Sequence, residues 1–197
     1  MEELKKYFIT TDRPYREGEV LLLRQKFSGK DVVSATLYAT ALGVYEAEIN
    51  GKKVGEQMFA PGYTYYPRRV LYQEHDVTAL LSADGENELR VYLGQGWYCG
   101  RFLCENKTQI YGEKPGVSWM LCLTFADGAE RIIHSGTDVE ELESPYEYAG
   151  EYDGEIYHAD KGCTVTGHPV VFEGKRDFAL EKTLTKVRVQ EEMPVKA

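Results

Sequence analysis

The chain lacks the features that mark several classes of protein. Its four cysteines include no Cys-x-x-Cys pair, so reduced thiols are expected, with a Cys99–Cys104 bridge as the alternative in an oxidising setting. No segment approaches the roughly 20 apolar residues of a membrane-spanning helix. The first residues also lack the apolar core of a signal peptide. We therefore expect a cytoplasmic protein with no membrane partner.

The chain also lacks an excess of basic charge. It carries 32 Asp and Glu against 23 Lys and Arg, a formal net charge of −9 at pH 7. Phosphate groups repel such a chain, so nucleic acid is not expected as a partner. The four histidines are scattered without the spacing of a zinc site or a nucleophile, and none of them is a candidate ligand.

Long helical patterns are missing, and short alternating runs take their place. Apolar residues recur at every second position, the period of a strand with one buried face. This pattern predicts strands at residues 20–27, 34–40, 45–49, 70–74, 89–93, 119–125 and 131–134. Within the strands we expect one apolar set to be mostly buried: Leu21, Leu23, Leu37, Ile49, Leu71, Leu89, Val91, Leu93, Leu121 and Leu123.

Turn signals separate these strands. The Asn-Gly pair at 50–51 suits a type I′ hairpin turn, and the Asp-Gly pair at 127–128 suits another. One short helix is predicted at 76–81, where Asp76 or Thr78 can cap its start. Many short strands with so little helix favour an all-β fold, an antiparallel two-sheet β-sandwich with one short helix.

A length of 197 residues suits a single core. We place the sandwich domain at residues 1–161. Residues 162–197 show weaker alternation and contain Pro169 and Pro194, so they are predicted to form a trailing strand or linker toward a downstream domain. Within this segment, 187–189 are the strand candidate.

Aromatic residues gather where the strand at 89–93 ends. Glycines at 94 and 96 free the backbone there, which suits a loop that presents Trp97 and Tyr98 at the rim of the sheet. Tyr63 also follows a glycine. Such rings stack on the apolar face of a pyranose, so these three are the candidate carbohydrate-binding rings. The alternative for Trp97 is a ring that closes the end of the core.

Four polar residues are candidates for contacts with a sugar or a metal ion. Asn87 either presents its amide to a sugar hydroxyl or closes a turn with its own side chain, and Glu56 is the second polar sugar candidate. Asp153 and Glu155 flank a glycine and offer the oxygen ligands that calcium prefers. Their alternative is a solvated turn, because neighbouring loop carboxylates do not establish the separated pair of a glycosidase.

Six segments carry a family resemblance. They are ALGVYEAEINGKKVG at 41–55, APGYTYY at 60–66, YQEHDVT at 72–78, GEN at 85–87, GQGWYCG at 94–100 and YDGEIY at 152–157. In order and spacing they resemble the amino-terminal β-sandwich domain of bacterial α-L-rhamnosidases. Two departures stand out: Tyr63 replaces the usual Trp, and His158 and Asp160 replace an aspartate and an arginine that follow the last motif.

The resemblance implies a jelly-roll, galactose-binding-like module of a larger glycoside hydrolase. Catalytic residues of that family lie in a helical toroid far downstream, so no catalytic residue is expected here. In some members the module binds L-rhamnose with help from calcium. We therefore hold two hypotheses: an accessory domain that assists recognition of rhamnose-containing glycans, or a structural docking domain that packs against downstream domains without binding sugar.

Overall fold

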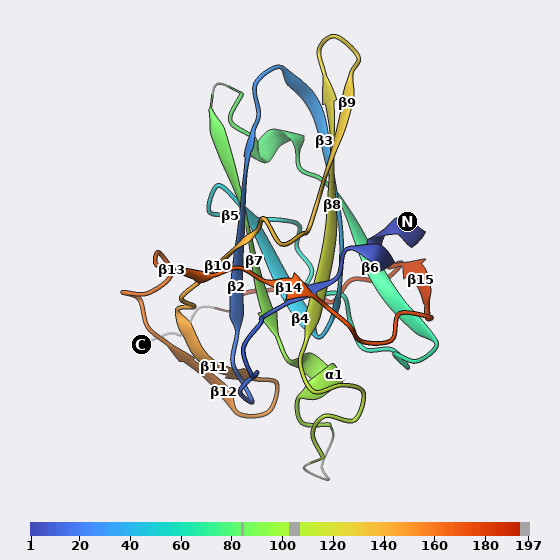
Figure 1. The fold of residues 1–197 in the computed structure, drawn as a ribbon, viewed down its shortest axis with the longest axis vertical. Helices are drawn as coiled ribbons and strands as arrows, with labels where there is room; N and C mark the ends of the chain where they lie inside the picture. The colour runs from blue at the N-terminus through green and yellow to red at the C-terminus, as the bar shows by residue number, and fades with distance from the viewer. Residues whose placement is uncertain (84, 103–106, 194–197) are drawn as a thin grey trace.

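A computed structural model describes residues 1–83, 85–102 and 107–193 of the chain. Over this range the chain forms two stacked sheets, as Figure 1 shows, which confirms the predicted β-sandwich. Helical turns are confined to the 3-10 helices η1 (Glu2–Lys6) and η2 (Thr78–Leu80) and the single α-helical turn α1 (Gly96–Cys99) in the described residues. None of these helices is long and apolar enough to cross a membrane.

The first sheet has the strand order β14-β1-β8-β3-β6-β15, and β9 also pairs with β8. Neighbouring strands run antiparallel except β15, which is parallel to β6. The bounds are Ile9–Thr10 (β1), Val32–Leu42 (β3), Arg69–Asp76 (β6), Gly116–Phe125 (β8), Glu130–His134 (β9), Val170–Val171 (β14) and Ala179–Lys182 (β15).

The second sheet has the order β13-β10-β2-β7-β4-β5, all antiparallel. Its bounds are Leu21–Ser28 (β2), Val44–Ile49 (β4), Lys52–Lys53 (β5), Glu86–Gly94 (β7), Glu140–Leu142 (β10) and Val165–Gly167 (β13). A separate hairpin, β11 (Tyr146–Gly150) and β12 (Gly154–Tyr157), lies beside this sheet at one end of the sandwich (Figure 1). All seven predicted strands are present.

The core lies between the two sheets. Nine of the ten residues predicted to be buried are buried, and Leu71 is half-buried. Leu71 lies in β6, where its neighbour Val70 is fully buried. On β4, and on β7 as far as Leu93, burial alternates, and every second side chain faces away from the core. These outward faces remain available to form a site.

The turns confirm the predicted hairpins but not both turn types. Asn50 and Gly51 have φ of 53° and 73°, as a type I′ turn requires. At 127–128 only the glycine has a positive φ, 84°, and its N–H donates to the Phe125 carbonyl. This is a three-residue loop ending in a left-handed glycine, so the second type I′ prediction is wrong. The predicted helix at 76–81 shortens to the 3-10 turn η2.

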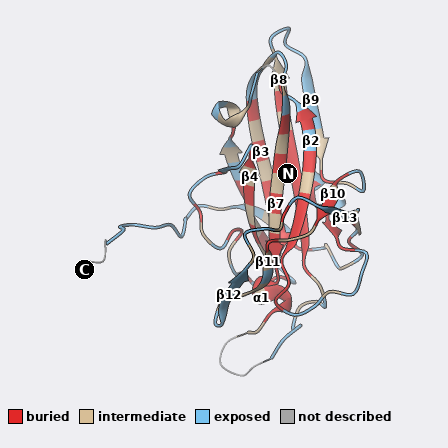
Figure 2. Ribbon diagram, turned by 90° about the vertical axis from the view of Figure 1, so that its left-hand side faces the viewer, coloured by how far each residue is buried: buried red, intermediate tan, exposed pale blue. Residues whose placement is uncertain are grey.

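The trailing segment contributes strands to both sheets. It supplies β13, β14 and β15, and its Phe172 and Phe178 are buried in a second apolar cluster with Phe8 and Tyr66. Residues 187–189 form no strand, since the described residues after β15 contain none. Figure 2 shows exposed chain leading away from the sandwich toward the C-terminus. Cys104 and Pro194 lie outside the described residues, and Cys99 is buried.

Candidate functional site

The predicted aromatic loop is the helical turn α1. Consecutive residues on such a turn point about 100° apart. Trp97 therefore stays partly exposed, whereas Tyr98 points inward and is only 6% exposed. Tyr98 packs in the second apolar cluster, edge-on to Tyr66 at a ring distance of 5.2 Å, instead of standing at the rim.

Trp97 belongs to a group of neighbouring rings that we call the ring surface: Phe59, Tyr63, Trp97 and Phe102. Ring centroids lie 6.1 Å apart for Phe59 and Trp97, 6.1 Å for Tyr63 and Trp97, and 5.4 Å for Tyr63 and Phe102. Phe59 is 50% exposed and Tyr63 is 46% exposed. The structure thus brings two of the three predicted rings together and adds Phe59 and Phe102, which no pattern in the sequence indicated.

The two polar sugar candidates interact with other residues of the chain. Asn87 is fully buried, and its carboxamide oxygen accepts hydrogen bonds from the Ser82 N–H at 2.7 Å and the Asn50 side chain at 2.8 Å. Its amide group donates to the Ser82 carbonyl at 3.0 Å. Asn87 therefore closes the turn before β7 and offers no group to a ligand. Glu56 is exposed and pairs with Arg188 at 3.3 Å.

Asp153 and Glu155 lie at the tip and on the second strand of the β11–β12 hairpin. The Tyr148 hydroxyl donates to Asp153 at 3.0 Å, and Arg101 pairs with the other carboxylate oxygen at 3.0 Å. Among the described residues, no group of three or more His, Cys, Asp or Glu side chains is placed to hold a metal ion. Calcium also accepts backbone carbonyl oxygens as ligands, so calcium binding by Asp153 and Glu155 stays a prediction.

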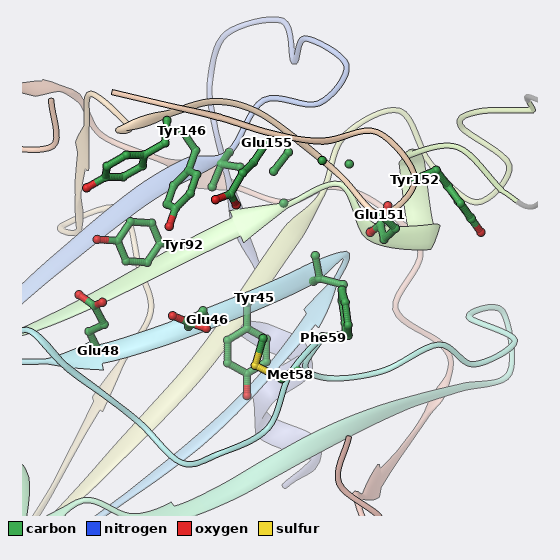
Figure 3. Close-up of a pocket in the computed structure, with 18 residues that line it drawn as sticks. Tyr45, Glu46, Glu48, Met58, Phe59, Tyr92, Tyr146, Glu151, Tyr152 and Glu155 are labelled. Atoms are coloured by element: carbon green, nitrogen blue, oxygen red, sulfur yellow. The ribbon is translucent and has the colours of Figure 1, made fainter. Parts of the chain in front are cut away.

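Glu155 also lines a cleft of about 620 Å³ between the second sheet and the hairpin. The floor is the outward face of β4 and β7, where Glu46 lies opposite Tyr92. The hairpin forms the roof, with Tyr146 and Tyr157 beside Glu155, as the labelled part of Figure 3 shows for Tyr146 and Glu155. The ring centroid of Tyr146 lies 5.9 Å from that of Tyr92 and 5.0 Å from that of Tyr157. Tyrosines from the floor and the roof of the cleft are therefore neighbours.

The end of the cleft near α1 carries further groups. Met58 and Phe59 close the end near the ring surface, and Glu151 and Tyr152 lie beside α1 (Figure 3). Phe59 has a φ of 55°, a conformation that is strained for a bulky residue and common at functional positions. Phe59 therefore joins the cleft to the ring surface.

The roof is held in place by Gly18. Its carbonyl accepts a hydrogen bond of 2.7 Å from the N–H of Ala149, and its own N–H donates to the side-chain oxygen of Gln95 at 2.8 Å. A Cβ at this position, where φ is +77°, would lie 2.1 Å from the Tyr148 ring. Only glycine allows this approach, so the hairpin docks against the turn before β2.

Burial and like charge raise the pKa values of two carboxyl groups of the cleft, those of Glu48 and Glu151. Burial, reinforced by neighbouring Glu46, raises the pKa of Glu48 above its ordinary value. Burial also raises the pKa of Glu151, with a smaller contribution from Asp153. Burial, with a further contribution from Glu48, also raises the pKa of Tyr92. The cleft is thus partly desolvated and electrically negative.

The sequence placed the residues of the cleft floor on an outward face but did not mark them as a site. Glu46, Glu48 and Tyr92 occupy the outward phase of the alternation in β4 and β7, and Tyr157 closes the YDGEIY motif. Outward residues are usually solvated, so nothing in the pattern singled them out. Only the docking of the hairpin makes these positions concave.

Comparison with known proteins identifies relatives that match most of this chain. Residues 30–172 match the model of the α-L-rhamnosidase N-terminal domain. An α-L-rhamnosidase of Streptomyces avermitilis is 43% identical over 132 residues, which is 67% of this chain and 13% of the relative. One of Formosa agariphila is 35% identical over 139 residues, 70% of this chain and 15% of the relative. The chain therefore spans only about one seventh of the length of these curated relatives.

Solved structures of α-L-rhamnosidases are also similar to this chain. Native α-L-rhamnosidase of Aspergillus terreus superimposes with a TM-score of 0.77 and 34% identity, over 86% of this chain and 21% of that one. The Streptomyces avermitilis α-L-rhamnosidase complexed with L-rhamnose gives a TM-score of 0.71 and 35% identity, over 79% of this chain and 16% of that one. Both likenesses cover the sandwich of this chain and a small part of the larger structure.

Proposed function

We propose that this chain, which belongs to the family of α-L-rhamnosidase N-terminal domains, is a non-catalytic domain that assists a glycoside hydrolase by recognising rhamnose-containing glycans. The observation that carries this proposal is the cleft, whose two walls bring tyrosine rings and carboxylates together. Its volume of about 620 Å³ falls within the range of ligand pockets, roughly 300 to 1,000 Å³.

The cleft chemistry suits a sugar. A pyranose presents apolar faces, which Tyr92, Tyr146 and Tyr157 can cover, and hydroxyl groups, which donate hydrogen bonds to carboxylate oxygens such as those of Glu155. A 6-deoxy sugar such as L-rhamnose adds a methyl group, which suits the Met58 and Phe59 end. The complex of the Streptomyces avermitilis relative with L-rhamnose supports the choice of this sugar as the first ligand to test.

A second candidate function comes from the ring surface. Phe59 and Tyr63 are about half exposed and touch Trp97, which makes a contiguous apolar area. Contiguous exposed apolar areas mark contacts with other proteins as well as with ligands. In this alternative the ring surface packs against other domains of the same enzyme, and the chain binds no sugar.

Titration of the chain with L-rhamnose, followed by NMR chemical shifts, separates the two functions. We expect millimolar binding with shifts around the cleft. Tyr157→Ala should weaken it by about two- to tenfold, the value of one stacked ring. Tyr65→Ala is the matched control, because Tyr65 is 58% exposed, Tyr157 is 55% exposed, and only Tyr157 lines the cleft.

Two results would contradict the cleft assignment. Binding that survives Tyr157→Ala and disappears in Trp97→Ala would move the sugar to the ring surface. The absence of any shift at millimolar L-rhamnose, with and without calcium, would favour the docking function.

A further inference from the structure

The cleft carries charge of one sign. Glu46 and Glu48 project from β4 on the floor, and Glu151 and Glu155 lie on the hairpin side, as Figure 3 shows. Among the described residues that line it, none is a lysine, arginine or histidine. A ligand in the cleft therefore meets four carboxyl groups and no basic lining residue.

The nearby bases offset this charge only in part. Lys53 pairs with Glu46, which neutralises one of the four. Arg90 lies close enough to Glu48 to lower the pKa of that carboxyl group. The Arg90 Nε, however, donates its hydrogen bond to Glu88. Arg101 is held by Asp153. Glu151 and Glu155 form no ion pair with any residue that the structure describes, so the hairpin side of the cleft keeps its negative charge.

Partial burial strengthens the effect of this charge. Interactions between charges are several-fold stronger near a protein surface than in bulk water. The raised pKa values of Glu48 and Glu151 are consistent with a site where an added negative charge is disfavoured. Neutral hydroxyl groups meet no such penalty, because each donates a hydrogen bond to a carboxylate.

We infer that the cleft selects uncharged glycans and rejects acidic ones, with Glu151 and Glu155 as the residues that set this selectivity. The inference rests on the proposed function, since it concerns the same cleft. The ligands of the cleft are then neutral rhamnosides. Glycans whose uronate or sulfate groups must enter the cleft are rejected.

A matched pair of ligands tests the selectivity. One is a disaccharide of rhamnose and a hexuronic acid, and the other is the same disaccharide with its carboxyl group reduced to an alcohol. We expect the reduced form to bind about tenfold tighter at low salt, and the difference to shrink as ionic strength rises. Calorimetry or NMR titration with the whole chain measures both affinities.

Charge-neutral variants locate the effect. Glu151→Gln and Glu155→Gln keep the side-chain shape. Each should narrow the gap in affinity between the reduced and the acidic disaccharide. Glu130→Gln is the control, because it changes the net charge equally but lies on exposed β9 of the other sheet. It should leave the gap unchanged.

The outcomes distinguish a failure of the selectivity from a failure of glycan binding. Equal binding of both disaccharides, tighter binding of the acidic one, or a gap that Glu130→Gln narrows as much as Glu155→Gln would overturn the selectivity and leave glycan binding standing. Binding of neither disaccharide, nor of L-rhamnose, would overturn the proposed function and the selectivity with it.

Discussion

The indole N–H of Trp119 donates a hydrogen bond of 2.7 Å to the side-chain oxygen of Gln25. Trp119 lies on β8 of the first sheet and Gln25 on β2 of the second, so the bond joins the two layers inside the core. The Gln25 amide also donates to the His134 carbonyl at 3.1 Å. Both side chains are buried, so neither can exchange its partner for water.

Gln25→Leu should therefore destabilise the chain by about 1 to 3 kcal/mol, the cost of leaving a buried polar group unpaired. Urea denaturation followed by tryptophan fluorescence measures the change. Gln190→Leu, at an exposed position of the trailing segment, is the control and should have little effect. In Trp119→Phe the same Gln25 change should cost less, because the donor is gone. Equal costs in both backgrounds would contradict the coupling.

The two tryptophans should respond differently to truncation. Trp119 is a fully buried side chain, and Trp119→Ala should cost about 3 to 5 kcal/mol. Trp97 is partly exposed on the ring surface, so Trp97→Ala opens a smaller cavity and should cost less. Thermal melts of the two variants compare them directly. A larger loss for Trp97→Ala would show that its ring closes the core.

Asn87→Ala should cost about 1 to 3 kcal/mol, because it leaves the Ser82 N–H and the Asn50 amide without their acceptor. It should leave the affinity for L-rhamnose unchanged, since Asn87 does not line the cleft. One melt and one titration test both statements. A stable variant with weakened sugar binding would restore Asn87 as a sugar contact.

Glu151→Gln should stabilise the chain at neutral pH. Burial raises the pKa of Glu151 above the ordinary 4.5, so its charged form is disfavoured in the folded state. The folded state binds the extra proton between 4.5 and the folded pKa, so the penalty grows as pH rises through that window. The gain from Glu151→Gln should therefore appear at pH 7 and vanish below about pH 4. A variant with the same stability change at both pH values would refute this.

We expect this chain to hydrolyse no aryl α-L-rhamnoside. Asp153 is occupied by Tyr148 and Arg101, and Asp153 and Glu155 belong to one hairpin. Glycosidases need two carboxyl groups on opposite sides of the bond, about 5 to 10 Å apart. Release of the aryl alcohol is measured against a buffer blank. Release above the blank that Glu155→Gln abolishes would defeat this prediction.

The sequence by itself determined the strands, most of the core and the family. Alternation is a local property, so residues such as Leu89 and Val91 had to share one face wherever β7 ended up. The Asn50-Gly51 turn is equally local, because only residues that tolerate a positive φ can form it. The ordered motifs at 41–100 and 152–157 sufficed to recognise the family.

Only the tertiary structure decided which outward side chains form a site. Glu46 and Tyr92 become the floor of a cleft because a hairpin more than fifty residues later in the chain docks on Gly18 and covers them. Trp97 and Tyr98 separate because one helical turn replaces the expected loop. Periodicity tells which side chains face away from the core, but whether another segment covers them depends on long-range packing, which no local pattern records.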